Sequence, residues 1–120
     1  MFRFFPAGGG ITVTLNQGQY FLTNLTPKAK EIIKTAQWVG NWWQLQSLVV
    51  ARRDRGQGYG HILLQDVKDR SAGMNCHIIL AAHPYANSWM TSDRLVLFYE
   101  KHGFERVHVT ARDPWMVWRC

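Results

Sequence analysis

Three glycines, Gly56, Gly58 and Gly60, fall within five positions of one short basic stretch, ARRDRGQGYGHILLQDV. An apolar segment (LQSLVV) comes just before that stretch, and an amphipathic run (HILLQDVKDR) follows the glycines at once. The first amides of a helix have no intrahelical partner and favour an anion, and glycines let the backbone come close to it. The sequence therefore predicts a strand, a glycine turn and a helix that together bind phosphate.

Two familiar nucleotide-binding loops do not fit this turn. No Gly-Lys-Ser/Thr is present, which excludes a Walker loop. The glycine spacing is Gly-x-Gly-x-Gly, and no acidic residue ends a following strand about 20 residues later, so the dinucleotide fingerprint fits poorly as well.

The first half of the chain predicts a hairpin, a helix and a strand. Alternating apolar residues over 11–22, with a turn at 16–18, are typical of a hairpin. Thr26 and Pro27 form a helix start, so we expect a helix over 27–37 that is broken at Gly40 and Asn41. The segment WWQLQSLVVA alternates and then becomes continuously apolar, as a strand entering a buried sheet does.

After the glycine turn the order of elements is helix, strand, helix, strand, strand. We expect a helix over 60–71, a short apolar strand in CHIILAAHP, and a helix in SDRLVLFYEKHG that is capped by Ser92 and stopped by Gly103. The segments FERVHVTA and WMVW predict the last two strands. Strands that alternate with helices in this way indicate an α/β fold whose ligand lies at the carboxyl ends of the strands.

Composition and charge narrow the class of protein. The 120 residues are 47% hydrophobic and 18% charged, which indicates one globular domain over 1–120. No apolar run reaches the length of about 20 residues that a membrane span needs, so we expect no membrane association. Cys76 and Cys120 form neither a disulfide framework nor a metal motif, so we expect a reduced, cytoplasmic protein. The net charge of +6 suits an anionic ligand or partner, but it also serves solubility and does not by itself name a function.

Two motifs resemble the GNAT family of N-acetyltransferases. Arg55-Gly56-Gln57-Gly58-Tyr59-Gly60 is similar to the family's Arg/Gln-x-x-Gly-x-Gly/Ala signature, and LVLFYEKHGF is similar to its LYEKxGF segment at the expected distance. Together they cover about residues 44–120. The resemblance implies a mixed, mostly antiparallel central sheet with helices on both faces. It also implies that this sheet is splayed at the two parallel strands that hold the cofactor.

The resemblance further implies acetyl-coenzyme A as the acetyl donor, with no metal. In this family the loop amides cradle the pyrophosphate, the strand before the loop pairs with the pantetheine arm, and an amide near Val50 faces the thioester oxygen. The residues implied to bind the cofactor are Leu48, Val49, Val50, Arg55, Gly56, Gln57, Gly58, Tyr59, Gly60, His61 and Ser92.

The implied catalytic residues are Tyr99 and His83. Tyr99 matches the tyrosine that the family uses as general acid toward the departing thiolate, although a core aromatic in a helix stripe is the alternative interpretation. Gln44 stands where many relatives have a glutamate base, and a glutamine cannot accept that proton. His83 follows an apolar strand and is the nearest candidate base by position; a simple strand-end residue is the alternative. Ser92 stands where many relatives have an asparagine, and it also fits a helix cap.

The predicted function is acetyl transfer to a primary amine by direct attack in a ternary complex. Shortened chains with an ending like WMVWRC resemble small acetyltransferases of phage and mobile elements, including an anti-CRISPR type, so a protein lysine is the first acceptor hypothesis. One alternative is a toxin-like enzyme that acetylates aminoacyl-tRNA, since the +6 charge suits RNA. The other is a catalytically degenerate binding protein on the same fold, which Gln44 and the short N-terminal part favour. A homodimer is compatible with each of them.

Overall fold

A computed structural model describes residues 10–50, 59–82, 91–107 and 114–120. Its elements are, in chain order, β1 (Gly10–Leu15), β2 (Gly18–Thr23), α1 (Pro27–Thr35), β3 (Asn41–Val50), α2 (Tyr59–Gly73), β4 (Cys76–Ala81), α3 (Ser92–Lys101), β5 (Glu105–Arg106) and β6 (Trp115–Trp118). The expected order of strands and helices is confirmed.

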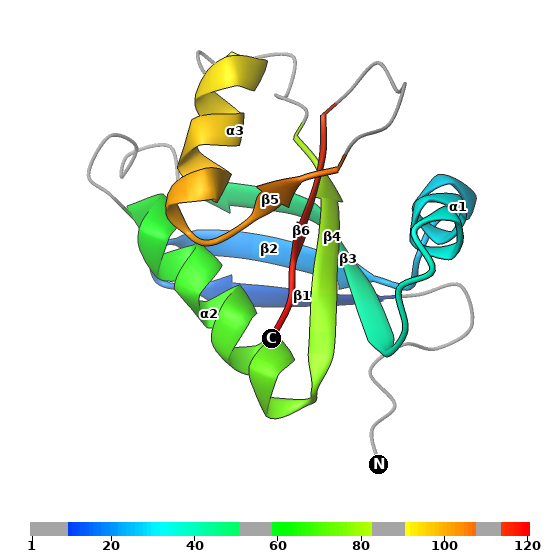
Figure 1. Ribbon diagram of the computed structural model, residues 1–120. Helices are drawn as coiled ribbons and strands as arrows, with labels where there is room; N and C mark the ends of the chain where they lie inside the picture. The colour runs from blue at the N-terminus through cyan, green and yellow to red at the C-terminus, as the bar shows by residue number, and fades with distance from the viewer. Residues whose placement is uncertain (1–9, 51–58, 83–90, 108–113) are drawn as a thin grey trace.

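The strands form one six-stranded sheet in the order β1-β2-β3-β4-β6-β5 (Figure 1). Only the β3–β4 pair is parallel; the other four neighbouring pairs are antiparallel. Parallel strands need a crossover connection, and α2 provides it between β3 and β4. The predicted mixed, mostly antiparallel α/β sheet is therefore confirmed.

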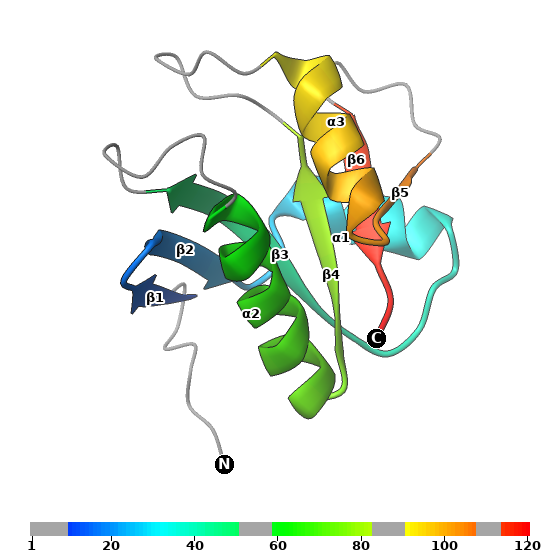
Figure 2. The same ribbon diagram turned by 90° about the vertical axis from the view of Figure 1, so that its left-hand side faces the viewer.

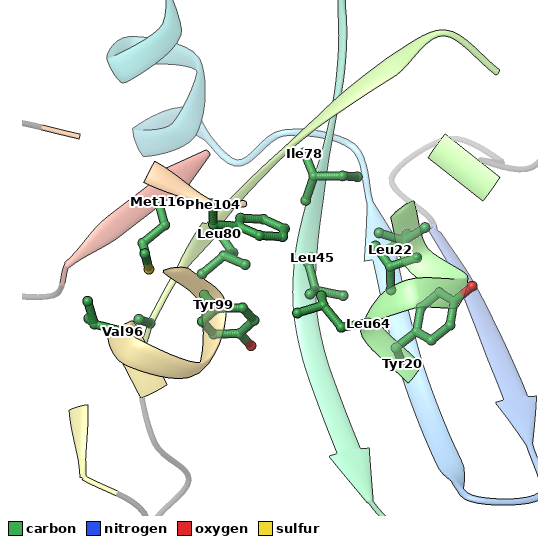
Figure 3. Close-up of a cluster of buried hydrophobic side chains, with 12 residues drawn as sticks. Tyr20, Leu22, Leu45, Leu64, Ile78, Leu80, Val96, Tyr99, Phe104 and Met116 are labelled. Atoms are coloured by element: carbon green, nitrogen blue, oxygen red, sulfur yellow. The ribbon is translucent and has the colours of Figure 1, made fainter. Parts of the chain in front are cut away.

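Helices cover both faces of the sheet, which gives two hydrophobic clusters. On one face, α2 and α3 pack over the sheet with Tyr20, Leu45, Leu80 and Met116 among the buried residues (Figure 3). On the other face, α1 packs against the part of the sheet formed by β3, β4 and β6. Figure 2 shows α1 behind the sheet, with α2 and α3 in front. None of the helices in the described ranges is long and apolar enough to cross a membrane.

The first helix begins where the sequence predicts and ends earlier. The hydroxyl of Thr26 caps α1 by accepting the N–H of Ala29, and Pro27 opens the helix. The helix ends at Thr35, before the predicted end at residue 37, because Gln37 adopts a left-handed conformation with φ 59°.

The cap of α3 corrects one prediction. Thr91, and not Ser92, is the N-cap: its backbone is extended and its hydroxyl accepts the N–H of Arg94 at 3.3 Å. Ser92 is already the first helical residue. The two adjacent hydroxyl residues are equally good caps by type, so sequence alone does not separate them. Gly103 ends this region as expected, with φ 87°.

Candidate active site

The two parallel strands separate halfway along β3. They pair from Asn41 with Cys76 to Gln44 with Ile79, and from there β4 pairs only with β6. Within the part of the chain that the structure describes, residues 45–50 of β3 have a strand partner on β2 alone, so their edge toward β4 pairs with no described strand. Figure 2 shows the two strands diverging toward their carboxyl ends. The splay that the family resemblance implies is therefore present.

A bulge in β3 lies where the splay begins. Phe21 pairs with Ser47 and the next residue, Leu22, pairs with Leu45, so Gln46 is an extra residue. Bulged strands bend and twist more strongly, which turns β3 away from β4. The bulge also places Leu45 and Leu48 on the same face of the sheet, where both join the cluster under α2 and α3. The sequence prediction did not include this bulge. The sequence feature that indicates it is the loss of strict apolar–polar alternation within WWQLQSLVV.

The start of α2 lies against the end of β3. A Cβ added to Gly60 would lie 3.2 Å from the ring of Phe98 and 3.8 Å from a methyl carbon of Val50. The first turn of α2, whose amides have no partner within the helix, is therefore adjacent to the splayed strand and to α3. Among the predicted cofactor-binding residues, Leu48, Val49, Val50 and Gly60 are brought together in this way.

Tyr99 lies on the face of α3 that packs on the sheet. It is 8% exposed, and its ring contacts those of Phe98 and Phe104 with centroids 5.3 and 5.5 Å away. In Figure 3 its ring lies between Val96 and Leu45, with the hydroxyl oxygen on the side of β3. The ring of Tyr99 therefore belongs to the core, and the role of its hydroxyl as general acid stays a prediction.

His61 is directed toward α3 rather than into the splay. Its side chain is exposed, and its Nδ1 shares a hydrogen bond with Nε2 of His102. The implied role of His61 in cofactor binding stays a prediction.

Two further predicted site residues, Tyr59 and Ser92, are the first residues of α2 and α3. The others lie outside the described residues: Arg55, Gly56, Gln57, Gly58 and the candidate base His83.

Gln44 has a structural partner. It is 5% exposed, and its Oε1 accepts the backbone N–H of Thr26 at 2.9 Å. Because Thr26 is also the N-cap of α1, this bond joins the start of α1 to β3. The residue that takes the place of the family's glutamate thus supports the fold on the α1 face of the sheet.

Replacing this glutamine gives a first prediction. Gln44→Leu leaves the Thr26 amide without its partner, so we expect the free energy of unfolding to fall by about 1–3 kcal/mol, measured by urea unfolding. The matched control is Gln19→Leu, since Gln19 is an exposed residue of the neighbouring strand β2 and such surface substitutions stay within about 0.5 kcal/mol. Equal stabilities of the two variants would contradict the assigned role.

A second polar network connects α2 to β2, and sequence analysis did not predict it. The hydroxyl of Tyr20, a fully buried residue, donates to Asp66, which also accepts from Arg70 at 2.9 Å. Burial, reinforced by the bond to Asp66, raises the pKa of Tyr20. Partial burial by itself raises the pKa of the Asp66 carboxyl. The hydrogen bonds from Tyr20 and Arg70 outweigh it and hold that pKa below its usual value. This network fixes the crossover helix against the sheet.

The described residues hold no group of three or more histidine, cysteine or acidic side chains that could bind a metal ion. Cys76 is buried and Cys120 is exposed, and both are free thiols. Burial raises the pKa of the Cys76 thiol, which makes it a poor nucleophile.

Comparison with known proteins identifies the fold and the family. The family model for the acetyltransferase (GNAT) domain matches residues 16–106, and no curated protein matches the chain. The anti-CRISPR protein AcrVA5 is 21% identical, with a TM-score of 0.65 over 92% of this chain and 98% of its own. An aminoglycoside 6′-N-acetyltransferase complexed with coenzyme A is 17% identical, with a TM-score of 0.62 over 92% of this chain and 72% of its own.

A third solved structure, a protein of Pyrococcus horikoshii OT3, is 20% identical, with a TM-score of 0.60 over 87% of this chain and 58% of its own. At these identities the likeness concerns the fold, while the family model spans most of the sequence. The chain belongs to the GNAT family of acetyltransferases.

Proposed function

We propose that this protein transfers the acetyl group of acetyl-coenzyme A to a primary amine, by direct attack within a ternary complex. The observation that carries the proposal is the meeting of three elements: the edge of β3 beyond Gln44, which pairs with no strand among the described residues, the first turn of α2 beside Val50, and Tyr99 on α3. An extended pantetheine arm can add to a free strand edge, and a pyrophosphate suits a helix start.

In the proposed reaction the neutral amine nitrogen attacks the thioester carbonyl carbon, and the carbon–sulfur bond then breaks. A backbone amide near Val50 stabilises the negative charge that develops on the carbonyl oxygen. Tyr99 gives its hydroxyl proton to the leaving thiolate, and the proton that the attacking nitrogen loses to solvent balances the one that returns to Tyr99. The products are an acetamide and free coenzyme A.

The attacking amine must first lose a proton, because a lysine ammonium has a pKa of about 10.4 in water. Gln44 cannot accept this proton, and its side-chain oxygen is bonded to Thr26. His83 remains the proposed base.

The proposed acceptor is a lysine of another protein. Two observations support it: the resemblance of the C-terminal segment to small acetyltransferases of mobile elements, and the fold likeness to AcrVA5 over nearly the whole length of both chains. Aminoglycoside and aminoacyl-tRNA amines are the competing acceptors.

Labelled acetyl-coenzyme A, incubated with the protein and a bacterial lysate, tests the proposal. We expect radiolabel on protein, lost on treatment with protease and retained after nuclease, and identified as acetyl-lysine by mass spectrometry. Label on RNA would replace the acceptor hypothesis. Absence of both label and acetyl-coenzyme A binding by calorimetry would overturn the enzyme and favour a protein that acts by contact.

A further inference from the structure

Two histidines join the first turn of α2 to the last turn of α3. Nδ1 of His61 and Nε2 of His102 share a hydrogen bond, and the ring centroids lie 4.7 Å apart. His102 is the C-cap of α3, and its own N–H bonds to the carbonyl of Tyr99 at 2.9 Å. The histidine that contacts α2 is therefore linked by the backbone to the proposed general acid.

Lys68 makes a second connection between the same two helices. Its ammonium donates to the backbone carbonyl of His102 at 2.9 Å. Lys68 lies about two helical turns beyond His61, so both side chains project from the same face of α2. His102 is thus held through its ring and through its carbonyl.

Phe98 fills the space between these groups and the site. Its ring centroid lies 5.2 Å from that of His61 and 5.3 Å from those of His102 and Tyr99. It is also the first group that a side chain on Gly60 would meet, at 3.2 Å. A continuous set of contacts therefore runs from the start of α2, through Phe98, to Tyr99.

We propose that His102 is a positioning residue for acetyl transfer: through its bond to His61 it holds the helix that carries Tyr99 at a fixed place relative to the start of α2. This inference rests on the proposed function, in which the start of α2 holds the pyrophosphate and Tyr99 protonates the thiolate. We call the His61–His102 hydrogen bond the clamp. A proton donor displaced by about 1 Å can lose on the order of 100-fold in rate, so loss of the clamp has a direct catalytic consequence.

The clamp depends on protonation. A hydrogen bond between two imidazoles needs one nitrogen with a free lone pair, so it is lost when both rings are protonated. Burial lowers the pKa of His102, and the nearby charges of His61 and Lys68 lower it further. These two α2 groups are the charges that act on His102 among the described residues; on its own helix Glu100 and Lys101 precede it and are exposed.

The direction of the pH effect follows from this lowered pKa. A histidine that is harder to protonate in the folded state contributes stability above its unfolded pKa of about 6.5, and the contribution is lost as the pH falls through the folded value. The clamp is therefore closed at neutral pH and released in acid.

Rate measurements between pH 5 and pH 8 test the proposal. We expect His102→Ala to lower kcat by about 10–100-fold while the Kd for acetyl-coenzyme A, measured by calorimetry, stays within about threefold. His102→Gln keeps a hydrogen-bonding group toward His61 that does not titrate, so it should restore most of kcat and flatten the acid limb. The matched control is His77→Gln, since His77 lies against Trp42 and Cys120 near the start of β4 and should retain the wild-type profile.

A measurement without catalysis separates the clamp from the proposed function. In the double-mutant cycle of His61→Ala and His102→Ala, the clamp predicts that the melting-temperature shifts of the single variants do not add in the double variant. Additive shifts, or a His102→Ala protein with full kcat, would overturn the clamp alone. A wild-type protein that neither binds acetyl-coenzyme A nor transfers acetyl would overturn the proposed function, whatever the outcome of the cycle.

Discussion

Tyr99→Phe is expected to slow acetyl transfer by about 10²–10⁴-fold, the usual contribution of a positioned proton donor. The substitution removes only the hydroxyl, and the ring that packs against Phe98 and Phe104 remains. Binding of acetyl-coenzyme A should therefore change little. Steady-state kinetics and calorimetry measure these two quantities, and thermal unfolding of the same preparation measures the stability.

Tyr20→Phe provides the matched control for this variant. Tyr20 is also a buried tyrosine, but its hydroxyl donates to Asp66 in the network between β2 and α2. A hydrogen bond to a charged group contributes about 1.5–3 kcal/mol, so this variant should lose stability and keep its rate. A Tyr99→Phe protein that behaves in this way, destabilised but fully active, would show that Tyr99 is a packing residue and not the acid.

The sequence predicted the sheet and helices well because their signals are local. The hairpin at residues 10–23 follows from alternation and a turn, and the start of α1 follows from Thr26 and Pro27. A core position was the alternative interpretation of Tyr99, and its ring does lie in the buried cluster. The parallel pairing of β3 with β4 follows once a helix is recognised between two apolar strands.

The contacts that shape the site were not predictable in the same way. The bulge at Gln46 depends on how β3 packs on two different partners, so a short apolar run does not reveal it. The bonds from Gln44 to Thr26 and from His61 to His102 join residues far apart in the chain. Such pairings arise only when the helices have docked, and no spacing rule along one segment predicts them.

The prediction that the glycine turn binds phosphate rests on the chemistry of glycines before a helix, and not on contacts. The fold brings the start of α2 beside the splayed β3, as this prediction requires, although Gly56 and Gly58 lie outside the described residues. The proposed pyrophosphate cradle is therefore best tested directly, by a substitution within the glycine turn.

Gly58→Glu is expected to weaken acetyl-coenzyme A binding by about 10²–10⁴-fold while the protein stays folded. The new side chain would stand where a pyrophosphate must approach the amides, and its carboxylate would repel the anion. Loss of two hydrogen bonds to a charged group, at about 1.5–3 kcal/mol each, gives this magnitude. Calorimetry measures the affinity, and circular dichroism verifies the fold.

Gly73→Glu is the matched control, because the same change is made at the carboxyl end of α2, the end that lies away from residue 59. A side chain at Gly73 meets nothing within 4 Å, and a carboxylate at a helix C-terminus costs at most about 1 kcal/mol. This variant should therefore bind acetyl-coenzyme A like the wild type. Gly58→Gln, with similar bulk and no charge, should retain most of the binding loss, since the proposed cradle would act through backbone amides that the side chain blocks. Wild-type affinity in Gly58→Glu would mean that the pyrophosphate binds elsewhere, and the proposed role of the glycine turn would then be wrong.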